Sequence, residues 1–215
     1  STHRPGAPNP TNNETKGGDM NEHHDAHSNS GHEHEETPPL RPRIWVGSLA
    51  DYNAGRLHGG WFDAAVPDER LLAEVQAMLD ASSEPVAEEY GIFDYDEFGA
   101  FKPGEYEDLR IVTAVARGIA EHGPAFAVWA ELHGADQAML AQFEDAYIGH
   151  FDDPEDWARD MLADIDDQLD QTIPASLRGY VEVDYAAWLR DCDMGGDIYI
   201  ESDPAGPGAY LFRIE

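Results

Sequence analysis

The sequence predicts an α+β fold. Between its strand-like segments, apolar residues recur at the three- and four-residue spacing of amphipathic helices. Apolar residues make up 41% and aromatic residues 10% of the 215 positions, which is enough to bury a core. The strand-like segments are rich in β-branched and aromatic residues and lie at 44–49, 57–64, 88–95, 197–202 and 210–215.

Residues 1–40 differ in composition from the rest of the chain. They are rich in Asn, Gly, Pro, Glu and His and have no periodic apolar positions, so we expect a disordered leader. Six of the ten histidines lie in this leader, and His-rich runs can bind transition metals. Because a flexible leader holds no fixed partners around its imidazoles, we predict no metal site there.

Residues 41–100 are predicted to form an N-terminal α+β module. Turn residues at 51–55 separate the first two strand-like segments, which predicts a β-hairpin or meander. A helix is expected from about Pro67 to Ala81, followed by a returning strand at 88–95. The module is therefore expected to be a three-stranded antiparallel sheet with one helix.

Residues 101–150 are predicted to form a central helical module. One helix is expected from about Leu109 to Gly123, and a second begins at Pro124 and ends at Gly134. A third is expected from Asp136 to about Tyr147. Short helices joined by tight turns indicate a small bundle.

Residues 151–215 are predicted to form an acidic C-terminal α+β module that opens with a helix over 151–170. Asp153 is a suitable N-cap and Pro154 a suitable first helical residue. We expect one apolar stripe of this helix to be buried, because its members recur at every fourth position. The stripe consists of Trp157, Met161, Ile165 and Leu169.

The rest of this module is predicted to be a short strand, a helix and a hairpin. YVEV at 180–183 has the composition of a short strand, and Asp184 is a suitable N-cap for the helix after it. The segments 197–202 and 210–215 flank turn residues, which predicts a C-terminal β-hairpin.

The opening helix also carries a row of aspartates. Like charges four residues apart destabilise a helix by about 0.2–0.5 kcal/mol per pair, so a helix that keeps several of them favours a role in binding. The alternative is a solvated acidic face. The row consists of Asp152, Asp156, Asp160, Asp164 and Asp167, joined by Asp166 and Asp170, with Arg159 as the basic residue among them.

The acidic charge is concentrated in the C-terminal module. The chain has 44 acidic and 13 basic residues and a net charge of −31, which repels nucleic acid and anionic membranes. Residues 152–203 carry 16 acidic and 3 basic side chains, whereas residues 41–66 are close to neutral. The predicted partner-binding residues are Asp152, Asp153, Glu155, Asp156, Asp160, Asp164, Asp166, Asp167, Asp170, Glu182, Asp184, Asp191, Asp193 and Asp197.

No catalytic, metal or cofactor site is predicted. The sequence lacks the P-loop, GxSxG and HExxH patterns, and a single cysteine, Cys192, excludes an intramolecular disulfide. The segment from Asp94 to Glu105 matches an EF-hand loop at only some positions, with Phe98 and Lys102 at two ligand positions. The reduced cysteine and the absence of a membrane span or signal-peptide core predict a cytoplasmic protein.

Four separated segments resemble the ArdA antirestriction proteins of conjugative plasmids, transposons and prophages. They are RIWVGSLADYNAGRLHGGWFDA (43–64), EEYGIFDYDEF (88–98), FEDAYIGHFDDPEDWARDML (143–162) and IPASLRGYVEVDYAAWLRD (173–191). The resemblance implies an elongated, three-module homodimer in the bacterial cytoplasm. Its acidic surface would imitate bent duplex DNA, occupy the DNA groove of type I restriction-modification enzymes and so protect incoming mobile DNA. The segment 157–169 resembles the family's antirestriction motif.

Two other functions also fit an acidic chain. An acidic calcium-binding protein would gain stability on adding the metal. An acidic chaperone of basic DNA-binding proteins would tolerate shuffling of its acidic positions at constant net charge, because it needs no fixed pattern of charge.

Overall fold

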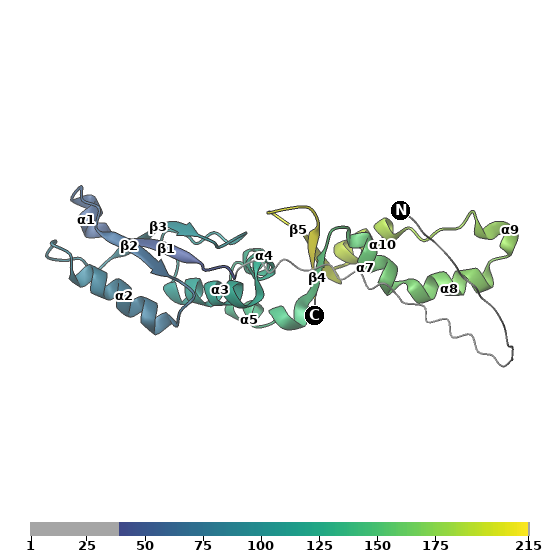
Figure 1. The fold of residues 1–215 in the computed structure, drawn as a ribbon, viewed down its shortest axis with the longest axis horizontal. Coiled ribbons are helices and arrows are strands. Elements are labelled where there is room, and N and C mark those ends of the chain that lie inside the picture. The colour runs from purple at the N-terminus through teal and green to yellow at the C-terminus, as the bar shows by residue number, and fades with distance from the viewer. Residues whose placement is uncertain (1–38, 215) are drawn as a thin grey trace, which may run out of the picture. The chain divides into compact units, whose positions relative to one another are not determined.

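The computed structural model describes residues 39–214, in which helices accompany two three-stranded antiparallel sheets (Figure 1). The α+β prediction is confirmed. The predictions for the leader fall almost entirely on residues 1–38, which lie outside the described part of the chain.

The first sheet has the strand order β2-β1-β3, with β1 (Arg43–Ser48) between β2 (Gly59–Asp63) and β3 (Tyr90–Asp96). Helix α2 (Asp68–Asp80) lies along one side of this sheet and shares its buried core (Figure 1). The predicted three-stranded antiparallel sheet and the helix that follows its second strand are therefore confirmed. The turn after β1 differs from the prediction, because Ser48 accepts a hydrogen bond from the backbone of Asp51 and caps a short helix, α1 (Leu49–Asn53).

The central helices begin as predicted. Helix α3 (Leu109–His122) is capped by Asp108, and Gly123, at φ 74°, leads directly into α4 (Pro124–Leu132). The two helices pack closely, because a Cβ on Gly118 would lie 2.2 Å from the Phe126 ring.

The predicted third helix from Asp136 to Tyr147 is wrong. Two four-residue helices, α5 (Gln137–Leu140) and α6 (Phe143–Ala146), take its place, and the chain then enters a strand, β4 (Tyr147–Phe151). The reason is tertiary, because β4 pairs with β6 at the far end of the sequence.

The second sheet has the order β4-β6-β5. Strands β5 (Ile198–Ser202) and β6 (Ala209–Arg213) form the predicted C-terminal hairpin, with Ile200 opposite Leu211. Asp184 caps α10 (Tyr185–Gly195) as expected. The strand predicted at 180–183 is wrong, because these residues follow α9 (Ala175–Arg178) without pairing with a strand.

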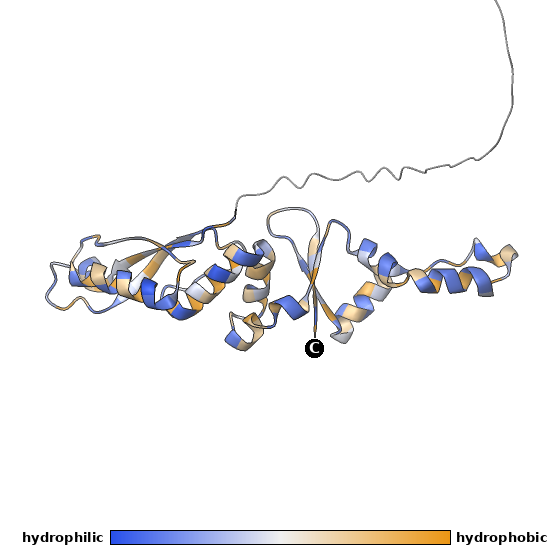
Figure 2. Ribbon diagram, turned by 60° about the horizontal axis from the view of Figure 1, so that its bottom comes forward, coloured by the Kyte–Doolittle hydropathy of each residue, from blue (hydrophilic) through white to orange (hydrophobic). Residues whose placement is uncertain are grey.

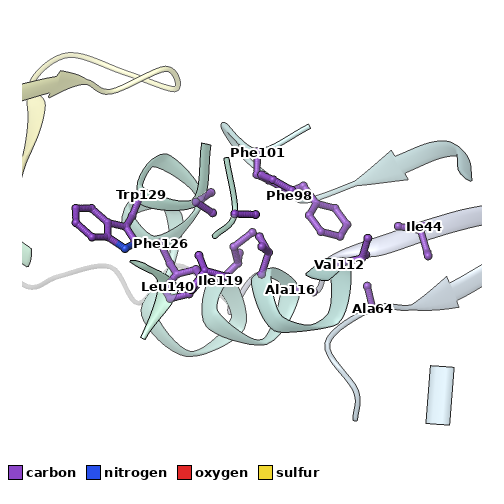
Figure 3. Close-up of a cluster of buried hydrophobic side chains, with 14 of the residues drawn as sticks. Ile44, Ala64, Phe98, Phe101, Val112, Ala116, Ile119, Phe126, Trp129 and Leu140 are labelled. Atoms are coloured by element: carbon purple, nitrogen blue, oxygen red, sulfur yellow. The ribbon is translucent and has the colours of Figure 1, made fainter. Parts of the chain in front are cut away.

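One buried cluster runs from the first sheet through the central helices to Phe212 of β6. Figure 3 shows Ile44 and Ala64 of the first sheet region facing Val112 of α3, with Phe126 and Trp129 farther along the cluster. The Trp129 indole N–H donates a hydrogen bond to the carbonyl oxygen of Met139 at 2.7 Å, so the polar group of this large buried side chain has a partner. None of the helices over residues 39–214 combines the length and the apolar character that a membrane crossing requires.

Candidate partner-binding surface

The acidic segment, residues 152–203, begins as a helix for the reasons that the sequence indicated. The Asp153 carboxylate accepts a hydrogen bond from the Glu155 backbone at 2.9 Å, and Pro154 is the first residue of α7 (Pro154–Met161). A single helix over 151–170 is nevertheless wrong. The chain leaves helical geometry at Leu162 (φ −104°, ψ 11°) and resumes as α8 (Ala163–Thr172).

The break separates a packed helix from an unpacked one. In α7, Ala158 is fully buried and the Trp157 ring lies 5.6 Å from that of Trp188 in α10. These residues belong to a second, smaller core with Leu189 and Ile198. Helix α8 buries no residue, so it has no apolar packing of this kind to hold it in line with α7.

The predicted burial of the apolar stripe is therefore correct only in part. Trp157 is half-buried, whereas Met161 is 57% exposed and Ile165 46% exposed. Leu169 is half-buried. In Figure 2, α8 mixes hydrophilic and hydrophobic residues. None of its hydrophobic residues is fully buried.

Two arginines neutralise part of the aspartate row. Arg159 contacts Glu155 at 3.0 Å and Asp156 at 2.5 Å. Arg178 makes a hydrogen-bonded ion pair with Asp170 and lies 3.8 Å from Asp166. The pairing of Arg178 with α8 was not predicted from the sequence, because it depends on the turn through α9 and not on helical spacing.

The carboxylate of Asp166 has a second partner in the hydroxyl of Tyr185, which donates a hydrogen bond to it. This hydrogen bond is the main cause of the raised pKa of Tyr185. Hydrogen bonding to Asp170 likewise raises the pKa of Arg178. Asp166 and Asp170 thus help to hold α8, α9 and α10 together and are less free to meet a partner.

On α7 and α8, three aspartates of the row remain open to a partner. Asp160, Asp164 and Asp167 are exposed and make no ion pair or side-chain hydrogen bond to any residue in 39–214. They bring three uncompensated charges to α7 and α8. The arrangement provides negative charge for a basic partner.

The other predicted surface residues divide into caps and free carboxylates. Asp153 and Asp184 are N-caps of α7 and α10. Exposed carboxylates without such a role in the described chain belong to Asp152, Glu182, Asp191, Asp193 and Asp197.

The cation sites considered from the sequence are not assembled in the described residues. No group of three His, Cys, Asp or Glu side chains over 39–214 is placed to hold a metal ion. Asp94 and Asp96 lie in β3, where Asp96 pairs with Arg43 at 2.5 Å, and Phe98 is buried in the core. The segment is a strand followed by a core residue, and it does not form an EF-hand loop.

Two further groups bear on chemistry. Burial, followed by the charges of Asp197 and Asp191, raises the pKa of the Cys192 thiol, which disfavours a reactive thiolate. His150 Nε2 lies 3.1 Å from Asp203, a contact that was not predicted from the sequence. This contact connects β4 to the β5–β6 turn, so its role is structural.

Comparison with known families decides the identity. The family model of the antirestriction protein ArdA matches residues 44–204, which include nearly all of the first sheet, the central helices, strands β4 and β5 and all of residues 152–203. This chain belongs to the ArdA antirestriction family. The resemblance found in the sequence is therefore confirmed. A search of curated proteins finds no match. As a member of the ArdA family, the chain has an antirestriction function, and the family consists of inhibitors and not of enzymes.

Proposed function

We propose that this ArdA protein inhibits type I restriction-modification enzymes as a DNA mimic, by occupying the groove that otherwise binds DNA. The observation that carries the proposal is the set of uncompensated, exposed carboxylates of Asp160, Asp164 and Asp167 on α7 and α8. An enzyme that binds phosphates through Lys and Arg meets a complementary field on this surface. No atom is transferred, so inhibition requires binding alone.

The spacing of the charges supports this mode of binding. Duplex DNA carries about one negative charge per 1.7 Å of axis, or about one per 3.4 Å on each strand. Carboxylates four residues apart on a helix are about 6 Å apart along its axis. One helix therefore imitates a strand coarsely, and several acidic elements together imitate a longer stretch.

We propose that the protein acts as a homodimer in the cytoplasm of the bacterial host, where restriction enzymes meet incoming DNA. The exposed side chains of Met161 and Ile165 support a second chain as their cover, because burying them removes apolar surface from water. A two-fold axis would also double the length of acidic surface.

The two alternative functions have less support. The EF-hand-like segment is occupied by β3 and core side chains, which removes the specific argument for calcium. A chaperone of basic proteins needs charge but no fixed pattern, so it predicts that moving carboxylates between elements leaves function intact.

The proposal is tested by DNA cleavage with a purified type I enzyme. We expect increasing amounts of this protein to inhibit cleavage and increasing amounts of DNA to relieve the inhibition. The protein concentration that gives half-maximal inhibition should rise with the DNA concentration. This relation should not depend on the DNA sequence outside the recognition site. Inhibition that excess DNA does not relieve would overturn competition for the groove.

A further inference from the structure

The face of the first sheet opposite α2 is built on a row of glycines. Side chains alternate between the two faces of a strand, so Ile44 and Val46 point into the core while Trp45 and Gly47 lie on the opposite face. Gly47 pairs with Gly59 on one side and with Gly91 on the other. Three neighbouring strands therefore leave a shallow floor without side chains.

Aromatic rings lie over this floor. A Cβ on Gly47 would lie 2.6 Å from Cζ3 of Trp45 and 3.0 Å from the Phe93 ring, and a Cβ on Gly59 would lie 2.7 Å from Cη2 of Trp45. The Trp45 and Phe93 rings meet edge to face with centroids 5.8 Å apart. The glycines thus allow both rings to lie against the backbone of the sheet.

Other aromatic and apolar side chains complete an open hollow. Tyr52 is 58% exposed and its ring lies 5.3 Å from that of Phe93, and Trp61, opposite Trp45 in the register, is 45% exposed. The hollow has a volume of 340 Å³ and is lined by Trp45, Tyr52, Leu57, Trp61, Phe93 and Asp94. Clustered, exposed Trp and Tyr are typical of binding hot spots and are unusual on a surface that meets only water.

The charges around this aromatic hollow differ from those of the acidic segment. Arg43 lies 5.2 Å above the Trp61 ring and is already paired with Asp96 at 2.5 Å. Asp94, at the rim, is exposed and forms no ion pair with any residue from 39 to 214. The hollow therefore offers apolar rings and one open carboxylate, which fits an apolar ligand that carries a single cation.

We propose that the aromatic hollow binds a proline-rich, extended segment of a protein partner, with an Arg or Lys of that segment paired to Asp94. Proline-rich segments dock on aromatic-lined grooves because their polyproline II conformation is already formed before binding. That helix advances about 3.1 Å per residue, so every third residue recurs at about 9 Å. Adjacent strands are about 4.8 Å apart, so β2 and β3, which carry Trp61 and Phe93 on either side of β1, are separated by about twice that distance, which matches this repeat.

Polyproline peptides that differ only in charge test the proposal. The probes are a short polyproline peptide that begins with arginine and the same peptide beginning with glutamate, each titrated into the full chain while tryptophan fluorescence is recorded. We expect saturable binding of the arginine peptide and a weaker response to the glutamate peptide. Trp61→Ala and Tyr52→Ser should each weaken binding by at least about tenfold, as hot-spot residues do.

Two further variants separate specific docking from a general effect. Asp94→Asn should remove the preference for the arginine peptide, while binding of the proline portion remains. The matched control is Tyr106→Ala, because Tyr106 is an exposed aromatic residue (72%) that does not line the hollow. Circular dichroism should show that all variants keep their helical content.

Three results would overturn the proposal. The first is no binding of either peptide at millimolar concentration, and the second is equal binding by the parent and Trp61→Ala. The third is a lower oligomeric mass for Trp61→Ala than for the parent in light scattering, which would assign the hollow to a second copy of this chain. Because the probes are peptides, the outcome is independent of whether the acidic surface inhibits a restriction enzyme.

Discussion

The three uncompensated aspartates of α7 and α8 allow charge to be removed with little change in the fold. Changing Asp160, Asp164 and Asp167 together to Asn removes like-charge repulsion within the helices, including that between Asp167 and Asp170. Each such pair destabilises a helix by about 0.2–0.5 kcal/mol, so its removal is stabilising. The change also removes the favourable interaction of the Asp164 charge, in the first turn of α8, with the helix dipole, which contributes about 0.3–1 kcal/mol. These effects oppose one another, so we expect the unfolding free energy to change by less than about 1 kcal/mol.

Inhibition should nevertheless fall. Exposed ion pairs contribute about 0.2–1 kcal/mol each, so losing three weakens binding by about 0.6–3 kcal/mol. The half-inhibitory concentration of the triple variant should rise by about 3-fold to 150-fold in a type I cleavage assay at low salt. The difference from the parent should shrink as added salt screens exposed charges.

A second triple variant separates position from total charge. Glu69, Glu88 and Glu131 are exposed and lie outside the acidic segment, and changing them to Gln alters the net charge by the same amount. We expect this control to inhibit nearly as well as the parent. If both triple variants melt normally and inhibit equally well, the aspartate row of α7 and α8 is a solvated face and our reasoning about it is refuted.

Three further predictions concern stability and assembly. Trp157→Ala should lower the unfolding free energy by about 2 kcal/mol, less than for a fully buried tryptophan because Trp157 is half-buried against Trp188; unchanged thermal melting would contradict this packing role. A hydrogen bond from Ser82 is the main cause that holds the pKa of Asp51 below its ordinary value of 3.8, so this carboxylate stabilises the fold above about pH 4 and loses that effect as pH falls through its folded pKa. The difference in melting temperature between the parent and Asp51→Asn should therefore be largest at neutral pH and shrink below pH 4, and a difference that does not vary with pH would refute this assignment. Light scattering at micromolar concentration should give a dimer mass for the parent and a smaller mass for the double variant Met161→Ser and Ile165→Ser, whereas a monomeric parent would refute the homodimer.

Much of the fold follows from signals that are local in the sequence. The first sheet, α2 and the C-terminal hairpin were predictable because turn residues separate segments of strand composition, and each strand finds a partner nearby or after one helix. The starts of α7 and α10 were predictable for a similar reason, since Asp153 and Asp184 cap them through backbone groups two or three residues away. The sequence by itself also determined the family and the concentration of acidic charge at 152–203.

Only the tertiary structure decided which faces are covered. The segment Tyr147–Phe151 becomes a strand because β6, some sixty residues later, pairs with it, and no local pattern reports such a pairing. Periodicity placed Trp157 and Ile165 on one face, but α10 covers the first and nothing in the described chain buries the second. Likewise, Arg178 neutralises Asp170 through a turn that helical spacing does not anticipate. A periodic sequence determines which side chains share a face, whereas burial and charge pairing depend on the elements that the rest of the chain brings against that face.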